Sequence, residues 1–268
     1  PDEGVINVLG SPDAAAVKDR LGYLPEEKGL YKKMRTLELV TYLGRLKGLA
    51  TAEARRRATA LLTRYGLGDW LDRRCEALSK GMGQKVQLLA TLIHEPELVI
   101  LDEPFSGLDP VNVVLVRRLL IELKEEGRTI LLSTHMMGEA EKLADDIVMI
   151  HGGRVVLAGT LADVRAAAGK NTVQLQFEGD GGFLSRLPGV LGSTVTTNGA
   201  ELLLSEGSDP QEVLAAAVGR VRLRRFEVAS PTLEEIFIER AGASAEVLAR
   251  GERVSLSWRA TSPVVLTE

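Results

Sequence analysis

Three continuous apolar runs constrain the fold of this chain more than any other feature. They span residues 98–101, 129–132 and 147–150, and each has the length of one strand. Because the runs are continuous rather than alternating, both faces of each strand are expected to be buried, as in a parallel sheet covered by helices. Helical patterns over residues 111–124 and 137–144 separate the runs. This order of strands and helices predicts an α/β layer.

A helical region precedes these strands. Leu39, Tyr42, Leu43 and Leu46 recur at the spacing of one helix face, with Thr36 as the expected N-cap. Further helical patterns run through residues 54–65 and 81–93, so we expect a helical subdomain over about residues 33–93. Short strands are predicted over residues 5–9 and 21–24.

The pattern changes from about residue 170. Alternating strands, a hairpin turn at Asn198-Gly199 and a helix capped by Asp209 give the order β-α-β-β-α-β, which predicts a small ferredoxin-like α+β domain. We therefore divide the chain into residues 1–168, 169–242 and 243–268. The last segment shows no clear pattern, and we expect it to be a flexible tail.

Composition limits the function classes. The chain has 268 residues, a formal charge of −4 and a single cysteine, Cys75. This balance favours no nucleic-acid partner, and the lone thiol fits a reducing compartment. No segment has the roughly 18 to 20 consecutive apolar residues that span a bilayer. We expect a cytoplasmic protein.

Two adjacent carboxylates, Asp102 and Glu103, follow the first apolar run. Ligands in open α/β sheets bind beyond such carboxyl ends of strands. One carboxylate can hold Mg²⁺, and its neighbour, on the opposite side of the strand, can orient an attacking water. Taken alone, the alternative is a strand that ends in solvated acids.

Three further motifs accompany this pair. Leu-Ser-Lys-Gly-Met at residues 78–82 opens a helix, Ser-Gly-Leu-Asp-Pro spans 106–110, and Ser-Thr-His at 133–135 ends the next strand. In this order and spacing, the chain resembles the nucleotide-binding subunit of an ABC transporter. The resemblance implies a partial P-loop NTPase core with a mostly parallel sheet and a helical subdomain, followed by the small ferredoxin-like domain.

The resemblance also implies roles for individual residues in a site that binds ATP and Mg²⁺ between two subunits arranged head to tail. Glu103 and His135 would be catalytic, and Asp102 would bind the metal, together with Glu26 where the family usually has glutamine. The signature residues would contact the nucleotide held by the partner, and two residues of the following turn would cross the interface; these are Ser79, Lys80, Gly81, Met82, Ser106 and Asp109. The plainer alternatives are an ordinary N-cap for Ser79 and a simple turn at 106–110.

The resemblance implies partners as well. The pattern is similar to that of prokaryotic exporter-type ATPases with an extra C-terminal domain, which work with a membrane permease and a homo- or heterodimeric ATPase partner. The helix over residues 36–47 would dock the permease, which places the chain peripherally on the inner face of the cell membrane. The alternatives are a catalytically dead or regulatory partner subunit and a soluble ABC protein that does not transport.

A phosphate-binding loop is missing from the sequence. Such a loop needs Gly-x-x-x-x-Gly-Lys-Ser/Thr, whose backbone amides and lysine hold the phosphates, and no such run occurs among the 268 residues. Pro1–Gly4 resembles the turn that follows this loop in the family. We therefore expect that residues 1–168 lack the N-terminal strands and the Walker A loop of the domain, and that the chain alone binds ATP weakly or not at all.

Overall fold

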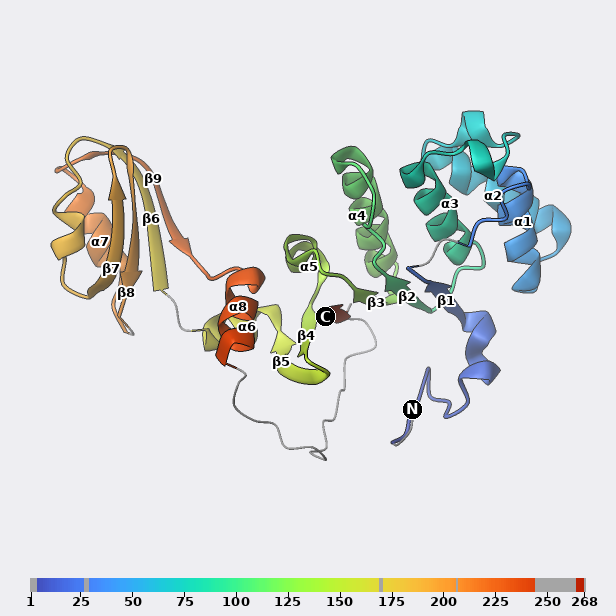
Figure 1. Ribbon diagram of the computed structural model, residues 1–268, viewed down its shortest axis with the longest axis horizontal. Helices are drawn as coiled ribbons and strands as arrows, with labels where there is room; N and C mark the ends of the chain where they lie inside the picture. The colour runs from blue at the N-terminus through green and yellow to red at the C-terminus, as the bar shows by residue number, and fades with distance from the viewer. Residues whose placement is uncertain (1–3, 27–28, 169–170, 206, 244–263, 268) are drawn as a thin grey trace. The chain divides into compact units, whose positions relative to one another are not determined.

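The computed structural model describes residues 4–26, 29–168, 171–205, 207–243 and 264–267 (Figure 1). The chain forms two compact units. The first comprises Pro1–Gly159 with Leu248–Glu268, and the second comprises Thr160–Val247. The second unit therefore interrupts the first in sequence. No helix in the described ranges is long and apolar enough to cross a membrane.

A six-stranded sheet forms the centre of the first unit, in the order β1-β2-β3-β10-β4-β5. The pairings from β1 through β4 are parallel. Gly152 and Gly153 both have positive φ in the two-residue turn between β4 and β5, as a hairpin turn of this length requires. The strand bounds are β1 Leu21–Leu24, β2 Leu98–Asp102, β3 Thr129–Ser133, β4 Asp146–His151, β5 Arg154–Thr160 and β10 Val264–Thr267.

The three apolar runs form β2, β3 and β4, as predicted. Val99, Leu101 and Ile147 are completely buried, whereas β3 alternates between buried and half-buried residues. Helix α4 (Pro110–Glu125) connects β2 to β3, and α5 (Met137–Leu143) connects β3 to β4. This confirms the α/β layer.

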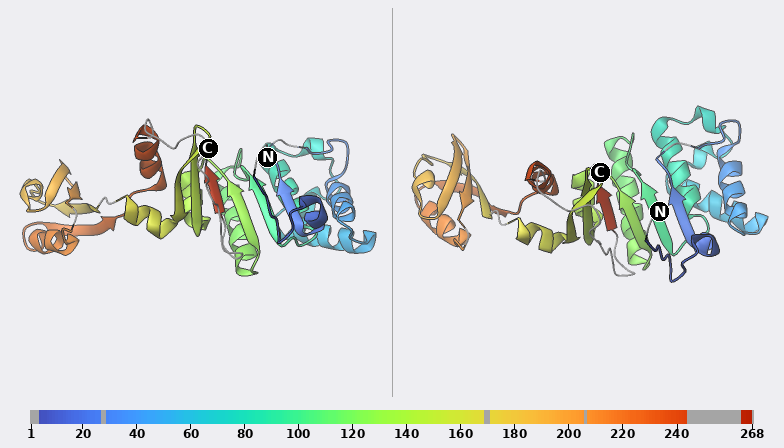
Figure 2. Two further views of the ribbon diagram at one scale, coloured as in Figure 1. Left: turned by 90° about the horizontal axis from the view of Figure 1, so that it is seen from below. Right: turned by 60° about the horizontal axis from the view of Figure 1, so that its bottom comes forward.

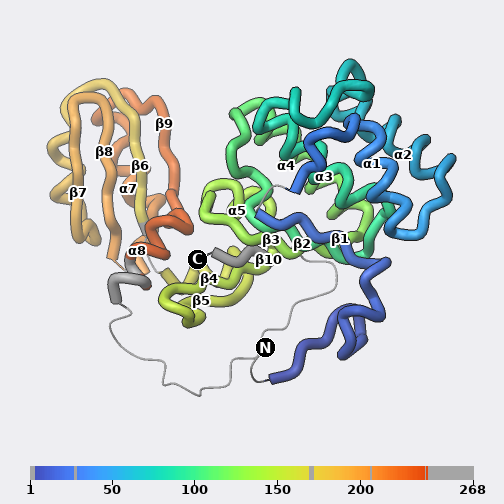
Figure 3. The backbone as a smooth tube through the Cα atoms, turned by 45° about the vertical axis from the view of Figure 1, so that its right-hand side comes forward, coloured from blue at the N-terminus to red at the C-terminus, as the bar shows by residue number. Residues whose placement is uncertain are grey.

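The helical region consists of α1 (Thr36–Leu46), α2 (Thr51–Arg64) and α3 (Lys80–Leu92), with the short 3-10 helices η2 (Gly68–Trp70) and η3 (Cys75–Ala77) between α2 and α3. Figure 3 shows these helices gathered beyond β1. Helices α1, α2 and α3 approach closely at Gly44, where an added Cβ would lie 3.0 Å from Ile93 Cδ1 and 3.3 Å from Ala54 Cβ.

Two local predictions in the first unit were wrong. Arg35, not Thr36, is the N-cap of α1; Thr36 is buried and its hydroxyl donates to the Arg73 carbonyl at 3.2 Å, so a tertiary contact replaces the cap. Residues 5–9 do not form a strand. Only a bridge between Val8 and Ser11 occurs there, and Val5 is 90% exposed, because no neighbouring strand pairs with this segment. The 3-10 helix η1 (Ala14–Arg20) follows.

The second unit contains α6 (Leu161–Ala167) and a four-stranded antiparallel sheet in the order β7-β8-β6-β9. This is the strand order of the predicted ferredoxin-like arrangement, although its first helix is only the 3-10 turn η4 (Leu184–Arg186). Val173, Leu202 and Val213 belong to its core. The remaining bounds are β6 Asn171–Glu178, β7 Val190–Thr196, β8 Gly199–Leu204, α7 Pro210–Ala217, β9 Arg222–Ala229 and α8 Leu233–Ala243.

The expected tail contains one strand. Val264–Thr267 forms β10, which lies between β3 and β4 in the first unit (Figure 2). The run is apolar and rich in β-branched residues, which favours a strand, but it is too short to show a period. Residues 244–263 and 268 lie outside the described ranges.

Candidate functional site

The candidate site lies where β1, β2 and β3 end. Leu24 pairs with Leu101, and Leu101 pairs with Leu132, so the residues that follow these strands come out at one edge of the sheet. Asp102 stands directly beside Ser133 in the parallel register. The Ser133 hydroxyl donates to Asp102 Oδ1 at 2.5 Å, the short distance of a charge-assisted hydrogen bond.

Glu103 adopts an uncommon backbone conformation, with φ of +45°. This left-handed conformation is unfavourable for a residue with a side chain, and such residues concentrate at functional sites. Its N–H donates to the Ser133 carbonyl at 3.0 Å, which anchors the chain at the turn. Its side chain is 14% exposed, so the carboxylate is nearly enclosed at the edge of the sheet.

The Glu103 carboxylate contacts both residues that follow Ser133. The His135 backbone N–H donates to Oε1 at 2.7 Å, and His135 Nδ1 also lies 2.7 Å from Oε1. The Thr134 hydroxyl donates to Oε2 at 3.4 Å. The His135 side chain is 70% exposed, so its ring extends from the enclosed carboxylate toward solvent. This arrangement can orient a water molecule and accept its proton.

The predicted signature residues form a second cluster at the start of α3. The Ser79 side chain caps the helix by accepting the Met82 N–H at 3.3 Å. Lys80 passes over Gly107, where an added Cβ would lie 2.4 Å from Lys80 Cε. Gly81 faces the same turn, because a Cβ added at Gly81 would lie 3.6 Å from Leu108 Cδ2. The start of α3 and the 106–109 turn are therefore packed together.

Asp109 caps the helix that follows this turn. Its Oδ1 accepts the Asn112 N–H at 2.9 Å, and its Oδ2 accepts from the Asn112 side chain at 2.5 Å. The hydrogen bond from the Asn112 N–H is the main cause that lowers the Asp109 pKa. Nearby, burial lowers the pKa of Lys85, and the charge of Asp109 opposes that shift. Asp109 is therefore held as a carboxylate at the N-terminus of α4.

Short connections link the two clusters. The Ser106 N–H donates to the Glu103 carbonyl at 3.1 Å, and Gln84 Nε2 donates to the Pro104 carbonyl at 3.5 Å. Glu26 is different. It is exposed, two residues beyond β1 at the same sheet edge, and no hydrogen bond or ion pair joins it to Asp102 or Glu103 in the described part of the chain.

The residues present fit a magnesium ion that is shared with a nucleotide. Among the described residues, no group of three or more His, Cys, Asp or Glu side chains could hold a metal ion by itself. Mg²⁺ is commonly held by one or two carboxylates and otherwise by waters and substrate phosphates. Asp102 has one oxygen on Ser133, and its second oxygen is available for this purpose.

The structure adds residues that the sequence did not single out. Ser133 and Thr134 contact the two carboxylates, and Gly107 lies beneath Lys80. The first two are part of the Ser-Thr-His motif, so their position at the end of an apolar strand was the available signal. Gly107 belongs to the recognised turn, but only the packing shows what its missing side chain accommodates.

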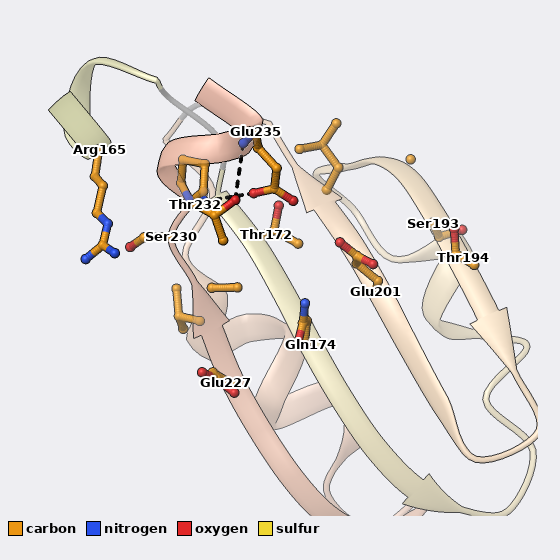
Figure 4. A pocket seen from close by; sticks show the side chains of 15 residues that line it. Arg165, Thr172, Gln174, Ser193, Thr194, Glu201, Glu227, Ser230, Thr232 and Glu235 are labelled. Carbon is orange, nitrogen blue, oxygen red and sulfur yellow. Dashed lines mark hydrogen bonds between the residues drawn. The ribbon is translucent and has the colours of Figure 1, made fainter. Parts of the chain in front are cut away.

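A separate hollow lies elsewhere, on the open face of the sheet in the second unit (Figure 4). It measures about 790 Å³, and Gln174, Glu201 and Glu227 are among the residues that line it. Thr232 and Glu235 at its rim form a reciprocal cap for α8, with hydrogen bonds of 2.8 and 3.2 Å. None of the predicted nucleotide-site residues lines this hollow.

Two family models match the sequence. The model described as "ABC transporter" matches residues 1–106, and the model described as "ATP-binding protein DrrA1-3-like, C-terminal domain" matches residues 159–241. Thus a separate family model covers most of each unit.

Individual relatives extend over nearly the whole chain. An uncharacterised ABC transporter ATP-binding protein of Bacillus subtilis, YhaQ, is 39% identical over 90% of this chain and 81% of its own length. The daunorubicin/doxorubicin resistance ATP-binding protein DrrA of Streptomyces peucetius is 30% identical over 92% of this chain and 78% of its own length. A solved ATP-binding subunit of an ABC transporter is 37% identical, with a TM-score of 0.58 over 63% of this chain and 72% of that one. The chain belongs to the family of ABC transporter ATP-binding proteins, which are ATPases, and carries a DrrA-like C-terminal domain.

Proposed function

We propose that this chain is the energy-coupling subunit of an ABC exporter and that it acts in a head-to-tail dimer with ATP and Mg²⁺ between the subunits. The observation that carries the proposal is the pairing of Asp102 and Glu103 with Ser133, Thr134 and His135 at one sheet edge. Relatives named for daunorubicin resistance and for Nod factor export support export as the direction.

The proposed roles follow from the contacts. Asp102 would hold Mg²⁺ through its second carboxylate oxygen, and the bound ion would neutralise charge on the phosphates. Glu103 would accept a proton from the attacking water, and its enclosed position keeps the carboxylate oriented. His135 would contact the terminal phosphate through the exposed part of its ring. The Ser79 cap and the adjacent amides of α3 would bind the same phosphate from the partner subunit.

An apolar groove supports a permease as the membrane partner. It measures about 290 Å³ and lies between the end of β1 and helices α1 and α3. Leu39 and Leu43 line it, and so do Tyr23 and Leu46, which are 55% and 62% exposed. We propose that a cytoplasmic helix of the permease binds here, which places the subunit on the inner face of the membrane.

Substitution of one exposed groove residue tests this docking. Leu46→Asp places a charge in the groove without disturbing a buried contact, so binding to the cognate permease should fall at least tenfold. Ile238→Asp is the matched control, because Ile238 is 65% exposed on a helix of the second unit. Equal loss of binding in both variants would refute the groove as the docking site.

Ser79→Asp tests the composite nucleotide site. Asp caps a helix as well as Ser does, but its carboxylate would repel a phosphate. The assay mixes this chain with a family subunit that carries the Gly-Lys-Ser/Thr loop and measures ATP hydrolysis. We expect the chain to stimulate hydrolysis, Ser79→Asp to abolish the stimulation, and Ser79→Thr to retain it. Unchanged stimulation by Ser79→Asp would rule out a nucleotide contact at the α3 start.

A catalytically inactive partner subunit is the second candidate. Calorimetry with Mg·ATP tests the expected weak binding by the isolated chain, and low-micromolar affinity would contradict it. Because an inactive subunit can also bind ATP, binding alone does not separate the two candidates. Glu103→Gln distinguishes them, because it impairs turnover only if this chain supplies a working catalytic carboxylate.

A further inference from the structure

We infer that Ser133 is a positioning residue for the metal ligand Asp102, and that it fixes which carboxylate oxygen of Asp102 is available to the metal. The inference rests on the proposed role of Asp102. Its basis is the short hydrogen bond from the Ser133 hydroxyl to Asp102 Oδ1, 2.5 Å long. A hydroxyl has a single hydrogen, so this bond engages one oxygen of the carboxylate and leaves Oδ2 without a partner in the described structure.

The backbone of Ser133 is held from both sides. It pairs with Asp102 of β2 on one side and with Leu266 of β10 on the other. Its carbonyl also accepts the Glu103 N–H at 3.0 Å. Because these contacts fix the backbone, only the rotation of the Ser133 side chain remains, and it places the hydroxyl 2.5 Å from Asp102 Oδ1 and 3.4 Å from the Leu101 carbonyl oxygen. The hydroxyl is thus presented to the carboxylate from a rigid position.

The residue that follows β3 contacts the carboxylate that follows β2 in a similar way. The Thr134 hydroxyl accepts the Met136 N–H at 3.1 Å, so its hydrogen is directed to Glu103 Oε2, 3.4 Å away. Successive hydroxyls at the end of β3 therefore contact successive carboxylates at the end of β2. This separates the two acids, and a single residue, Ser133, is left to orient Asp102.

A fixed carboxylate suits Mg²⁺, which demands nearly ideal octahedral geometry, whereas larger cations tolerate flexible and bidentate carboxylates. Partners that orient a ligand commonly change metal affinity about 10- to 100-fold when they are removed. Loss of the Ser133 hydroxyl should therefore weaken metal binding without removing a ligand.

The test titrates the full chain with Mn²⁺ alone, to about millimolar concentration because only one carboxylate and waters would hold the ion, and follows binding by electron paramagnetic resonance and water-proton relaxation. No binding by the unaltered chain would refute Asp102 as a metal ligand. Ser133→Ala should weaken Mn²⁺ binding about tenfold or more, and Ser133→Thr, which keeps the hydroxyl, should bind within about threefold of the unaltered chain. Thr129→Val is the control, because it removes a hydroxyl at the opposite end of the same strand. Circular dichroism checks that each variant is folded.

Asp102→Asn separates the two levels of the argument. If it leaves Mn²⁺ binding unchanged, Asp102 is not a metal ligand, and the proposed role on which this inference rests is wrong. If it abolishes binding while Ser133→Ala binds as tightly as the unaltered chain, Asp102 remains the ligand and the role of Ser133 is refuted. The inference would also be overturned if Ser133→Thr lost as much Mn²⁺ affinity as Ser133→Ala. The hydroxyl, which Ser133→Thr keeps, would then make no difference to metal binding.

Discussion

The contact of Lys80 with Gly107 gives a quantitative prediction for the substitution Gly107→Ala. Gly107 has φ of +71°, and an added Cβ would lie 2.4 Å from Lys80 Cε and 2.8 Å from Lys80 Nζ. Alanine in this left-handed conformation costs about 1–2 kcal/mol. The clash adds little, because Lys80 is exposed and its flexible side chain can rotate away. We expect the free energy of unfolding of the first unit to fall by about 1–2 kcal/mol.

Gly127→Ala is the matched control. Gly127 has φ of +81°, follows the C-cap of α4 in the same unit, and has nothing within 4 Å of an added Cβ. It therefore carries the same backbone cost without the clash. The two variants should differ by less than about 0.5 kcal/mol, which is the level at which surface substitutions usually act.

The assay is urea unfolding followed by thiol labelling. Cys75 is the only cysteine and is buried in the first unit, so labelling reports the opening of this unit alone. A cost of Gly107→Ala that exceeds that of Gly127→Ala by more than about 1 kcal/mol, a value typical of single substitutions, would show that Lys80 is rigidly held. If this extra loss of unfolding free energy disappears in the double variant Lys80→Ala/Gly107→Ala, the clash with the Lys80 side chain is its cause. No cost in either variant would refute the conformational argument itself.

Three further predictions concern the first unit. Gly22→Ala should destabilise it by about 1–3 kcal/mol in the same assay, because an added Cβ would lie 2.9 Å from the Thr91 carbonyl oxygen, which belongs to the backbone and cannot rotate away; unchanged stability would show that β1 can shift. Burial, followed by the hydrogen bond to Glu122, raises the pKa of Tyr65 to about 12, so an ultraviolet titration should show Tyr65 ionising near that pH. The stabilisation associated with this shift is complete below the unfolded pKa of about 10 and is lost as the pH rises through about 12, and Tyr65→Phe should remove that pH dependence. Burial raises the pKa of Cys75 as well, so the thiol should react with a disulfide reagent only after unfolding, and rapid labelling of the folded chain would contradict its placement.

The elements with strong local patterns were predictable from the sequence. The three apolar runs became parallel strands, and Ser79 and Asp209 cap helices as side-chain chemistry favours. Asp102 and Glu103 could be found because their position after a strand is itself a sequence feature. Local period and capping are properties of neighbouring residues, so a single sequence displays them.

Features that depend on distant residues were not predictable. Thr36 has the chemistry of a cap, yet the Arg73 carbonyl, 37 residues away, accepts its hydroxyl. The pairing of Ser133 with Asp102 joins residues 31 positions apart and depends on the strand register. The segment 5–9 has a strand-like composition, but a strand needs a neighbour, and the sequence does not say whether one exists.

The position of β10 has a consequence for how the protein is made. Strands β3 and β4 both pair with β10 (Val264–Thr267), and the chain between β4 and β10 includes all of the second unit. During synthesis, the ribosome therefore releases the strand that joins them only after the second unit has emerged. The first unit cannot complete its sheet vectorially, and contacts of such large sequence separation form slowly. Until then, the edges of β3 and β4 that later pair with β10 are open to other strands. We therefore expect chaperones to bind the nascent chain at these two edges.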